Sequence, residues 1–140
     1  MIFESHSEAE TFRFAEQLAK EAKAGAIYCL DGDLGAGKTV FAKGFAAGLG
    51  IEEPVTSPTF NIVKEYREGR LPLFHFDVYR IADPEEMDAI GYEEYLFGDG
   101  VSLVEWSELI ADLIPADAIH VCIQRDSQKG DDYRRIEVTP

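Results

Sequence analysis

Basic residues are scarce in this chain of 140 residues, and they are scarcest in its second half. The sequence has 13 Lys and Arg against 27 Asp and Glu, a formal net charge of −14. Residues 1–70 carry 8 basic and 11 acidic side chains, whereas residues 71–140 carry 5 and 16. Affinity for phosphate backbones and for anionic membranes comes from clustered Lys and Arg. We therefore expect neither a stand-alone nucleic-acid binder nor a membrane-surface protein.

The imbalance is greatest between Ile81 and Gln124, where eleven acidic residues occur and no Lys or Arg. An acidic stretch of this kind is typical of a solvated surface that aids solubility. It is also compatible with a surface that docks onto a basic partner. The sequence leaves both interpretations open.

Cysteine and long apolar runs are rare as well. Cys29 and Cys122 each lie within a short apolar run, which is typical of small buried side chains, so we expect reduced thiols. No Cys/His pattern indicates zinc. No apolar run approaches the ~20 residues that span a bilayer, and residues 1–10 do not resemble a secretory signal. These absences predict a cytoplasmic protein.

The sequence does contain enough apolar residues for one core. They make up 46% of the chain, and a chain of this length buries roughly two-thirds of its unfolded surface. This composition excludes intrinsic disorder and predicts a single domain over residues 1–140.

The hydrophobic pattern predicts strands that alternate with a few helices. A capping box at Ser7–Glu10 begins a helix that runs to about Lys23, and a second helix is expected over Lys38–Leu49. Two short helices are expected from Asp83 onward and over Glu93–Phe97. Strands are expected over Ala26–Leu30, Thr59–Tyr66, Leu71–Tyr79, Val101–Glu105, Ala118–Gln124 and Tyr133–Val138. This order indicates a small, strand-rich α/β domain.

The segment Gly32–Thr39, with the sequence GDLGAGKT, matches the phosphate-binding loop G-x-x-x-x-G-K-[ST]. Backbone N–H groups of such a loop point at phosphate oxygens, and the helix that follows adds its positive dipole end. Lys38 is expected to reach the β- and γ-phosphates, and the Thr39 hydroxyl is expected to ligate Mg²⁺. The candidate nucleotide contacts in the loop are Asp33, Leu34, Gly35, Ala36, Gly37, Lys38 and Thr39.

Two acidic residues at strand ends are candidates for the metal side of this site. Asp77 follows the apolar run Leu71–Phe76, and Glu105 follows Val101–Val104. One acid can hold Mg²⁺ while the other orients or deprotonates the attacking water. The spacing alone does not divide these roles between them.

Three further features carry two or more interpretations each. The hydroxyls of Thr56–Thr59 belong either to a nucleotide-sensing loop or to an ordinary turn. His75, on an apolar strand, is more typical of a core histidine than of a ligand. Trp106 is compatible with core packing, an adenine platform or a partner contact.

Motifs that the sequence lacks argue against two classes of nucleotide-binding protein, the GTPases and the small-molecule kinases. A GTPase would need a guanine-reading N-K-x-D motif, which the sequence lacks. A small-molecule kinase closes an arginine-bearing lid over the phosphates, and the Arg-free stretch leaves little material for one. A kinase is therefore the weakest alternative. The remaining candidates are a compact ATPase and an ATP-gated interaction switch with incidental turnover.

Four blocks, GDLGAGKT, TSPTF, HFDVYR and VEW, follow one another along the chain. Together they resemble the bacterial TsaE family, whose members are ATPases required to form threonylcarbamoyladenosine next to the anticodon of certain tRNAs. The resemblance implies a P-loop NTPase-type α/β fold with a parallel core sheet, added antiparallel edge strands and few helices. It also implies an accessory ATPase, weak alone, that acts with TsaD, which carries the transferase site, and with TsaB.

The resemblance further implies roles for individual residues. The family's phosphate loop falls on Leu34–Thr39, and its magnesium ligands fall on Thr39 and Glu105. Its functionally required aspartate falls on Asp77, which makes Asp77 and Lys38 the candidate catalytic residues. Asp77 would then lie nearer the attacking water or the outer coordination sphere of the metal.

Two more regions acquire a role from the resemblance. The TSPTF block corresponds to the family's switch region, so Ser57 and Thr59 are candidate nucleotide contacts. Gly130, in the turn before the last strand, matches a position near the nucleotide in relatives. The pathway's substrate is tRNA, but we expect no direct tight tRNA binding by this subunit. The acidic second half is expected to face a basic surface of the partner complex or to lie where tRNA would otherwise sit.

Overall fold

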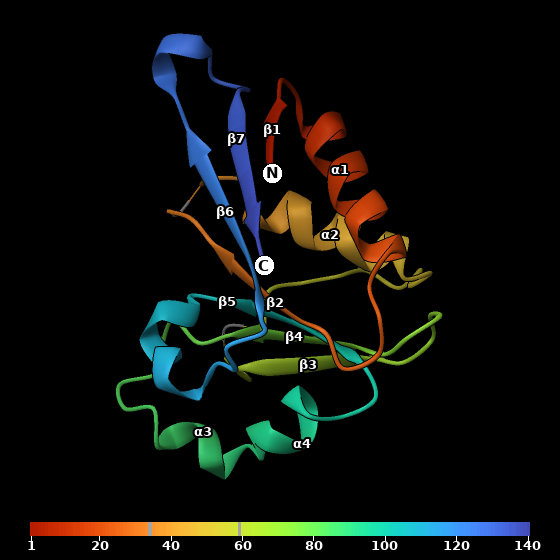
Figure 1. Cartoon of the computed structure of the whole chain (residues 1–140), viewed down its shortest axis with the longest axis vertical. Coiled ribbons are helices and arrows are strands. Elements are labelled where there is room, and N and C mark those ends of the chain that lie inside the picture. Colours follow the sequence, from red (N-terminus) through yellow and green to blue (C-terminus); the bar gives the residue numbers. More distant parts are fainter. Residues whose placement is uncertain (34, 59) are drawn as a thin grey trace.

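The computed structural model describes residues 1–33, 35–58 and 60–140. Its strands are β1 (Ile2–Ser5), β2 (Ile27–Asp31), β3 (Val63–Tyr66), β4 (Leu73–Asp77), β5 (Val101–Glu105), β6 (Ile119–Arg125) and β7 (Arg134–Thr139). They form a seven-stranded sheet in the order β1-β7-β6-β2-β5-β4-β3 (Figure 1).

The four central strands, β6, β2, β5 and β4, run parallel to one another. β7 and β1 are added antiparallel at one edge, and β3 is added antiparallel at the other. All five residues of β4 and of β5 are buried. Parallel strands covered on both faces are expected to be apolar nearly throughout, which is why the sequence pattern located them. The predicted parallel core with antiparallel edge strands is confirmed.

Helices cover the two faces of the sheet in two layers (Figure 1). α1 (Glu8–Lys20) and α2 (Lys38–Gly48) pack against each other over one face. α3 (Glu86–Ala89), α4 (Tyr92–Leu96) and the 3₁₀ helix η1 (Ser107–Leu113) lie over the other. Within the described residues, no helix combines the length and the apolarity needed to cross a membrane.

Alternate residues of β4 belong to different layers. Leu73 packs into the apolar core beneath α1 and α2, whereas Phe74 and Phe76 pack into the core beneath α3, α4 and η1. Because side chains alternate along a strand, His75 and Asp77 point to the same face as Leu73. That face carries the helix that follows the phosphate-loop segment.

The expected elements are present, with shifted ends. The capping box is confirmed, because the Glu10 backbone N–H donates to Ser7 Oγ at 3.1 Å. α1 ends at Lys20, three residues before the expected end, because the chain tightens into a 3₁₀-type turn toward Gly25, whose φ is +86°.

The other differences are short or irregular elements. β3 begins at Val63, and α3 begins at Glu86 after a turn at Asp83, in which the Asp83 side chain accepts from a backbone N–H. β1 and η1 were not expected. β1 has four residues at a sheet edge, and η1 is kinked at Ile110, so neither gives a regular hydrophobic period.

Candidate functional site

The loop between β2 and α2 has the predicted strand-loop-helix context. Gly35 and Gly37 have φ values of +78° and +104°, in the left-handed region that favours glycine. A Cβ on Gly32 would lie 2.7 Å from the carbonyl oxygen of Ile123 on the neighbouring β6. The loop backbone therefore depends on glycine at three positions. Leu34, also predicted to contact the nucleotide, lies outside the described residues.

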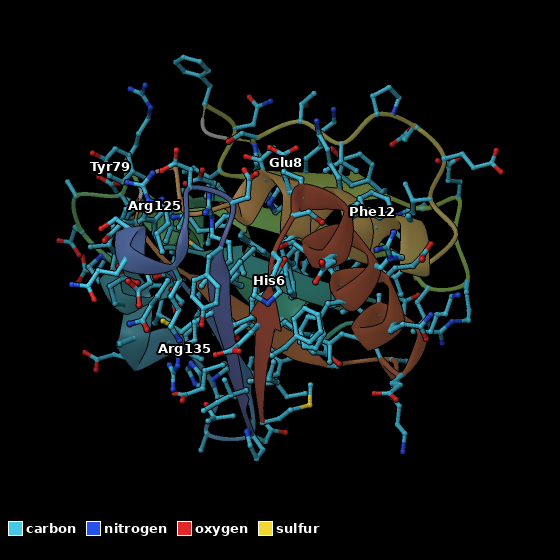
Figure 2. The ribbon with its side chains drawn as sticks, turned by 90° about the horizontal axis from the view of Figure 1, so that it is seen from above. His6, Glu8, Phe12, Tyr79, Arg125 and Arg135 are labelled. Carbon is cyan, nitrogen blue, oxygen red and sulfur yellow. The ribbon has the colours of Figure 1, made fainter. Side chains whose placement is uncertain are left out.

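A cavity of about 480 Å³ opens at the start of α2. It lies at the carboxyl ends of β4 and β5, the edge at which open parallel sheets bind ligands. The predicted site residues that line it are Gly35, Gly37, Lys38, Thr39, Ser57, Asp77 and Glu105. Glu8 from the start of α1 and Tyr79 from beyond β4 line the same cavity; both are labelled in the view from above (Figure 2). Residues far apart in the sequence therefore converge here.

Three predicted contacts line a different cavity. Asp33, Ala36 and Gly130 border an adjoining cavity of about 940 Å³, which shares the Trp106 side chain with the first. Gly130 is exposed, with a φ of +116°. Their contact with a nucleotide stays a prediction. Thr59, another predicted contact, lies outside the described residues.

The Lys38 ammonium group has an unusual environment. The residue is 6% exposed, and among the described residues its Nζ has no hydrogen-bond partner. Nζ lies 3.7 Å from the centroid of the Trp106 ring, a cation–π contact worth about 0.5–2 kcal/mol. Burial of a cation without an anionic partner costs several kcal/mol. Since no anionic group of the described residues is hydrogen-bonded to this ammonium, the site is complementary to an added anion.

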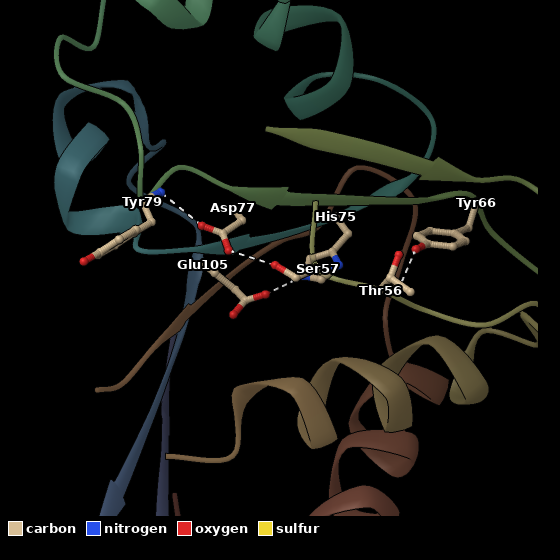
Figure 3. Close-up of polar contacts among 7 residues, drawn as sticks. All are labelled: Thr56, Ser57, Tyr66, His75, Asp77, Tyr79 and Glu105. Atoms are coloured by element: carbon tan, nitrogen blue, oxygen red, sulfur yellow. Dashed lines mark hydrogen bonds and ion pairs between the residues drawn. The ribbon is translucent and has the colours of Figure 1, made fainter. Parts of the chain in front are cut away.

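The two strand-end acids lie next to each other. Asp77 and Glu105 are Cα partners in the β4–β5 ladder, and they are 6% and 7% exposed. Ser57 Oγ donates to Asp77 Oδ2 at 3.2 Å, and the Tyr79 backbone N–H donates to Asp77 Oδ1 at 3.0 Å (Figure 3). The loop that contains Ser57 is thus tied directly to one of the acids.

Glu105 has a buried histidine as its partner. The distance from His75 Nε2 to Glu105 Oε2 is 2.6 Å, and His75 is 2% exposed (Figure 3). His75 is buried, as its position on an apolar strand indicated. Its contact with a candidate metal ligand was not predicted, because pairing between β4 and β5 is not encoded in local sequence.

Trp106 links the parts of the site. Its φ of +63° is in a region that costs a non-glycine residue about 1–3 kcal/mol. The centroids of the Tyr79 and Trp106 rings are 4.8 Å apart, and the Trp106 indole faces the Lys38 ammonium group. The structure thus places Trp106 at the candidate site, rather than in the core alone.

Asp31, at the end of β2, anchors the residue that follows Trp106. Ser107 donates to Asp31 Oδ1 from its backbone N–H at 3.2 Å and from its hydroxyl at 3.0 Å. Burial raises the pKa of Asp31, and the neighbouring Glu108 raises it further. Sequence reasoning missed this residue, although it immediately precedes the phosphate loop.

Two arginines that line the cavity were also missed. Arg134 Nε donates to the Ala36 carbonyl at 2.8 Å, so β7 supports the phosphate loop. No local signal marks Arg134, which lies near the end of the chain. Arg80 also lines the cavity, and its place in the HFDVYR block was the available signal. Together with Lys38, the two arginines place three cationic side chains at this cavity, although the protein is strongly acidic overall.

Known proteins are similar to this chain in sequence and in fold. The family model described as "Threonylcarbamoyl adenosine biosynthesis protein TsaE" matches residues 5–136. The TsaE protein of Bacillus subtilis is 51% identical over 130 residues, which cover 93% of this chain and 79% of that protein. The TsaE protein of Treponema pallidum is 41% identical over 120 residues, 86% of this chain and 88% of that protein.

A solved structure agrees with these matches. The crystal structure of Bacillus subtilis YdiB superposes with a TM-score of 0.83 and 44% identity, covering 97% of this chain and 82% of that one. The P-loop type of fold predicted from the four blocks is thereby confirmed. This chain belongs to the TsaE family.

Proposed function

We propose that this protein is an ATP-binding and ATP-hydrolysing accessory subunit for the formation of threonylcarbamoyladenosine in tRNA. The pathway comes from the family description and from the names of the relatives, which all refer to threonylcarbamoyladenosine biosynthesis. The observation that carries the chemistry is the buried Lys38 ammonium, which has no hydrogen-bond partner among the described residues and lines a cavity beside two carboxylates.

The triphosphate would be held by the loop backbone and by Lys38. N–H groups between Gly35 and Thr39, at the start of the 11-residue helix α2, supply donors and the positive end of the helix dipole. Lys38 adds a full charge at the β- and γ-phosphates. A phosphate bound there would pair with the Lys38 ammonium group. Nucleotide binding would then offset the free-energy cost of burying this charge.

The donor set at the cavity fits Mg²⁺. The Thr39 hydroxyl and the Glu105 carboxylate are hard oxygen ligands, and both residues line the cavity. Mg²⁺ is usually bound by one or two protein oxygens together with phosphate oxygens and waters. When bound, the ion would neutralise charge on the phosphates and stabilise the leaving ADP.

Asp77 is suited to the attacking water. Its carboxylate is fixed by Ser57 and by the Tyr79 backbone N–H, and it lines the same cavity. In the proposed step the water oxygen attacks the γ-phosphorus and passes its proton to Asp77. The bond from the γ-phosphorus to the bridging oxygen breaks, and ADP leaves. Lys38 stabilises the charge that develops on the phosphate oxygens.

TsaD and TsaB are the proposed partners. Ten of the eleven acids between residues 81 and 124 are exposed, Glu105 being the buried one. Most lie on or beside α3, α4 and η1, on the sheet face opposite the helix that follows the phosphate loop. We assign this acidic layer to contact with a basic surface of the partner complex, and we expect low turnover without it.

A second function, an ATP-gated interaction switch, is favoured by one contact. The Ser57–Asp77 hydrogen bond joins the TSPTF segment to the site, so loss of the γ-phosphate can alter that segment. Mixing the protein with TsaD and TsaB separates the two functions. Strong stimulation of phosphate release supports the ATPase, whereas nucleotide-dependent binding without turnover supports the switch.

The main test is Lys38→Ala, with Lys43→Ala as its matched control. Both lysines lie on α2, but Lys43 is exposed and does not line the cavity. We expect Lys38→Ala to reduce phosphate release by about 100-fold or more, and Lys43→Ala to leave it unchanged. If purified Lys38→Ala hydrolyses Mg-ATP as fast as the parent protein, the proposal is wrong.

A further inference from the structure

The buried pair of His75 and Glu105 has no place yet in the proposed chemistry. His75 is 2% exposed and does not line the cavity, so it cannot touch a nucleotide directly. Its Nε2 is 2.6 Å from Glu105 Oε2. Glu105 does line the cavity. Any effect of His75 on a ligand must therefore pass through Glu105.

The strand register fixes the position of the histidine relative to the carboxylate. In the β4–β5 ladder His75 is the Cα partner of Leu103, two residues before the Asp77–Glu105 pair. Side chains two residues apart point to the same face, so the His75 ring reaches diagonally to Glu105. Both residues lie in fully buried strands, which leaves the ring little freedom to move.

The bond engages one carboxylate oxygen of Glu105. With a proton on Nε2, the His75 ring donates to Glu105 Oε2, and this bond does not engage the second carboxylate oxygen, Oε1. A free glutamate side chain samples several rotamers, and ordering it costs free energy that a fixed hydrogen bond offsets. Oε1 is then the oxygen left for a ligand.

The hydrogen bonding of the two His75 ring nitrogens also argues against a role in core packing alone. His75 Nδ1 is buried and has no hydrogen-bond partner among the residues that the structure describes. An imidazole satisfied at only one nitrogen is a poorer core residue than an aliphatic or aromatic side chain of similar size. The satisfied nitrogen is the one that faces Glu105.

We propose that His75 is a positioning residue for Mg²⁺, holding Glu105 Oε2 so that Oε1 is presented to the ion. This inference rests on the proposed function, in which Glu105 is a metal ligand. Hydrogen-bonded partners of metal ligands typically contribute 10- to 100-fold to metal affinity.

The test compares His75→Gln with His75→Asn, using Mn²⁺ in place of Mg²⁺. The amide nitrogen of Gln can reach the position that Nε2 has in His75. The Asn side chain is one methylene shorter, so its amide nitrogen cannot reach that position. We expect Asn to weaken Mn²⁺ binding to the ADP complex by about 10- to 100-fold, measured by electron paramagnetic resonance, and Gln to restore most of it. ADP binding in EDTA should be the same in both variants.

The outcomes separate this inference from the proposed function. If the parent protein binds no Mn²⁺·ADP, the proposed function fails and the inference fails with it. If the parent binds and both variants match it, His75 has no positioning role. If the variants lose as much ADP affinity in EDTA as they lose in Mn²⁺, His75 has a structural role only, which also overturns the inference.

A measurement on the unsubstituted protein covers the case in which His75→Asn does not fold. The ¹⁵N chemical shift of His75 Nε2, assigned with His75→Gln, should change when Mg²⁺ is added to the ADP complex. An unchanged shift would contradict the inference.

Discussion

The two helical layers of this protein differ in charge. α1 and α2 together carry four basic and three acidic residues, a net charge of +1. α3, α4 and η1 carry six acidic residues and no basic ones, a net charge of −6. A protein with a net charge of −14 can therefore offer a tetraanionic ligand a locally favourable site. Charges farther away than ~8 Å are largely screened at physiological ionic strength.

The largest effect that sharpens this comparison is expected from Asp77→Asn, on the side of the phosphate loop. Loss of the proposed base should lower the rate of ATP hydrolysis by about 10²- to 10⁴-fold. Asparagine is nearly isosteric and keeps hydrogen-bonding groups for Ser57, so nucleotide affinity should change little. Single-turnover hydrolysis and an ADP titration measure the two effects. A parallel loss in both would place Asp77 in binding rather than in hydrolysis.

Glu105→Ala should have the next largest effect, on the metal. It removes a proposed ligand, so nucleotide binding in Mg²⁺ should weaken about 10-fold or more, whereas binding in EDTA should not. Calorimetric titrations with and without the ion provide the measurement. Equal losses in the two titrations would remove Glu105 from the metal site.

A smaller effect is expected on the acidic side of the comparison. The double change Glu93→Gln and Glu94→Gln in α4 should weaken association with the proposed partners, TsaD and TsaB, by less than about 10-fold and flatten its salt dependence. Glu52→Gln with Glu53→Gln is the matched control, since both residues are exposed and lie outside the acidic layer. If the two double variants behave alike, or if association is insensitive to salt, the acidic layer only aids solubility.

The smallest effect concerns Asp31, which joins β2 to η1 through Ser107. Because burial raises its pKa in the folded state, the protonated form is favoured by folding. Its contribution to stability is therefore full below the unfolded pKa of about 4, and it is lost as pH rises through the folded value. Relative to the parent, Asp31→Asn should gain stability with rising pH in denaturant titrations. A constant difference across pH would contradict the raised pKa.

The sequence predicted the parts of the site that depend on local pattern. Gly35 and Gly37, the start of α2 at Lys38, and the strand-end positions of Asp77 and Glu105 all follow from motif and periodicity. Adjacent parallel strands then bring the two acids together, because the carboxyl ends of such strands meet at one edge.

Contacts made across the fold could not be predicted in this way. The bond between His75 and Glu105 depends on which strands are neighbours, and the Arg134 bond to the phosphate loop joins residues 98 positions apart in the sequence. Trp106, whose φ is positive, directly precedes Ser107, which is hydrogen-bonded to Asp31 at the end of β2. Such features arise from strand order and packing, which no single local segment encodes.

The central claim is that ATP and Mg²⁺ occupy the cavity at Lys38, Thr39 and Glu105. A crystal structure with a non-hydrolysable ATP analogue and Mg²⁺ tests it most directly. We expect the γ-phosphate within hydrogen-bond distance of Lys38 Nζ, and the ion between Thr39 and Glu105. Phosphates bound in the adjoining cavity beside Asp33, or an ion with no bond to Glu105, would contradict the claim.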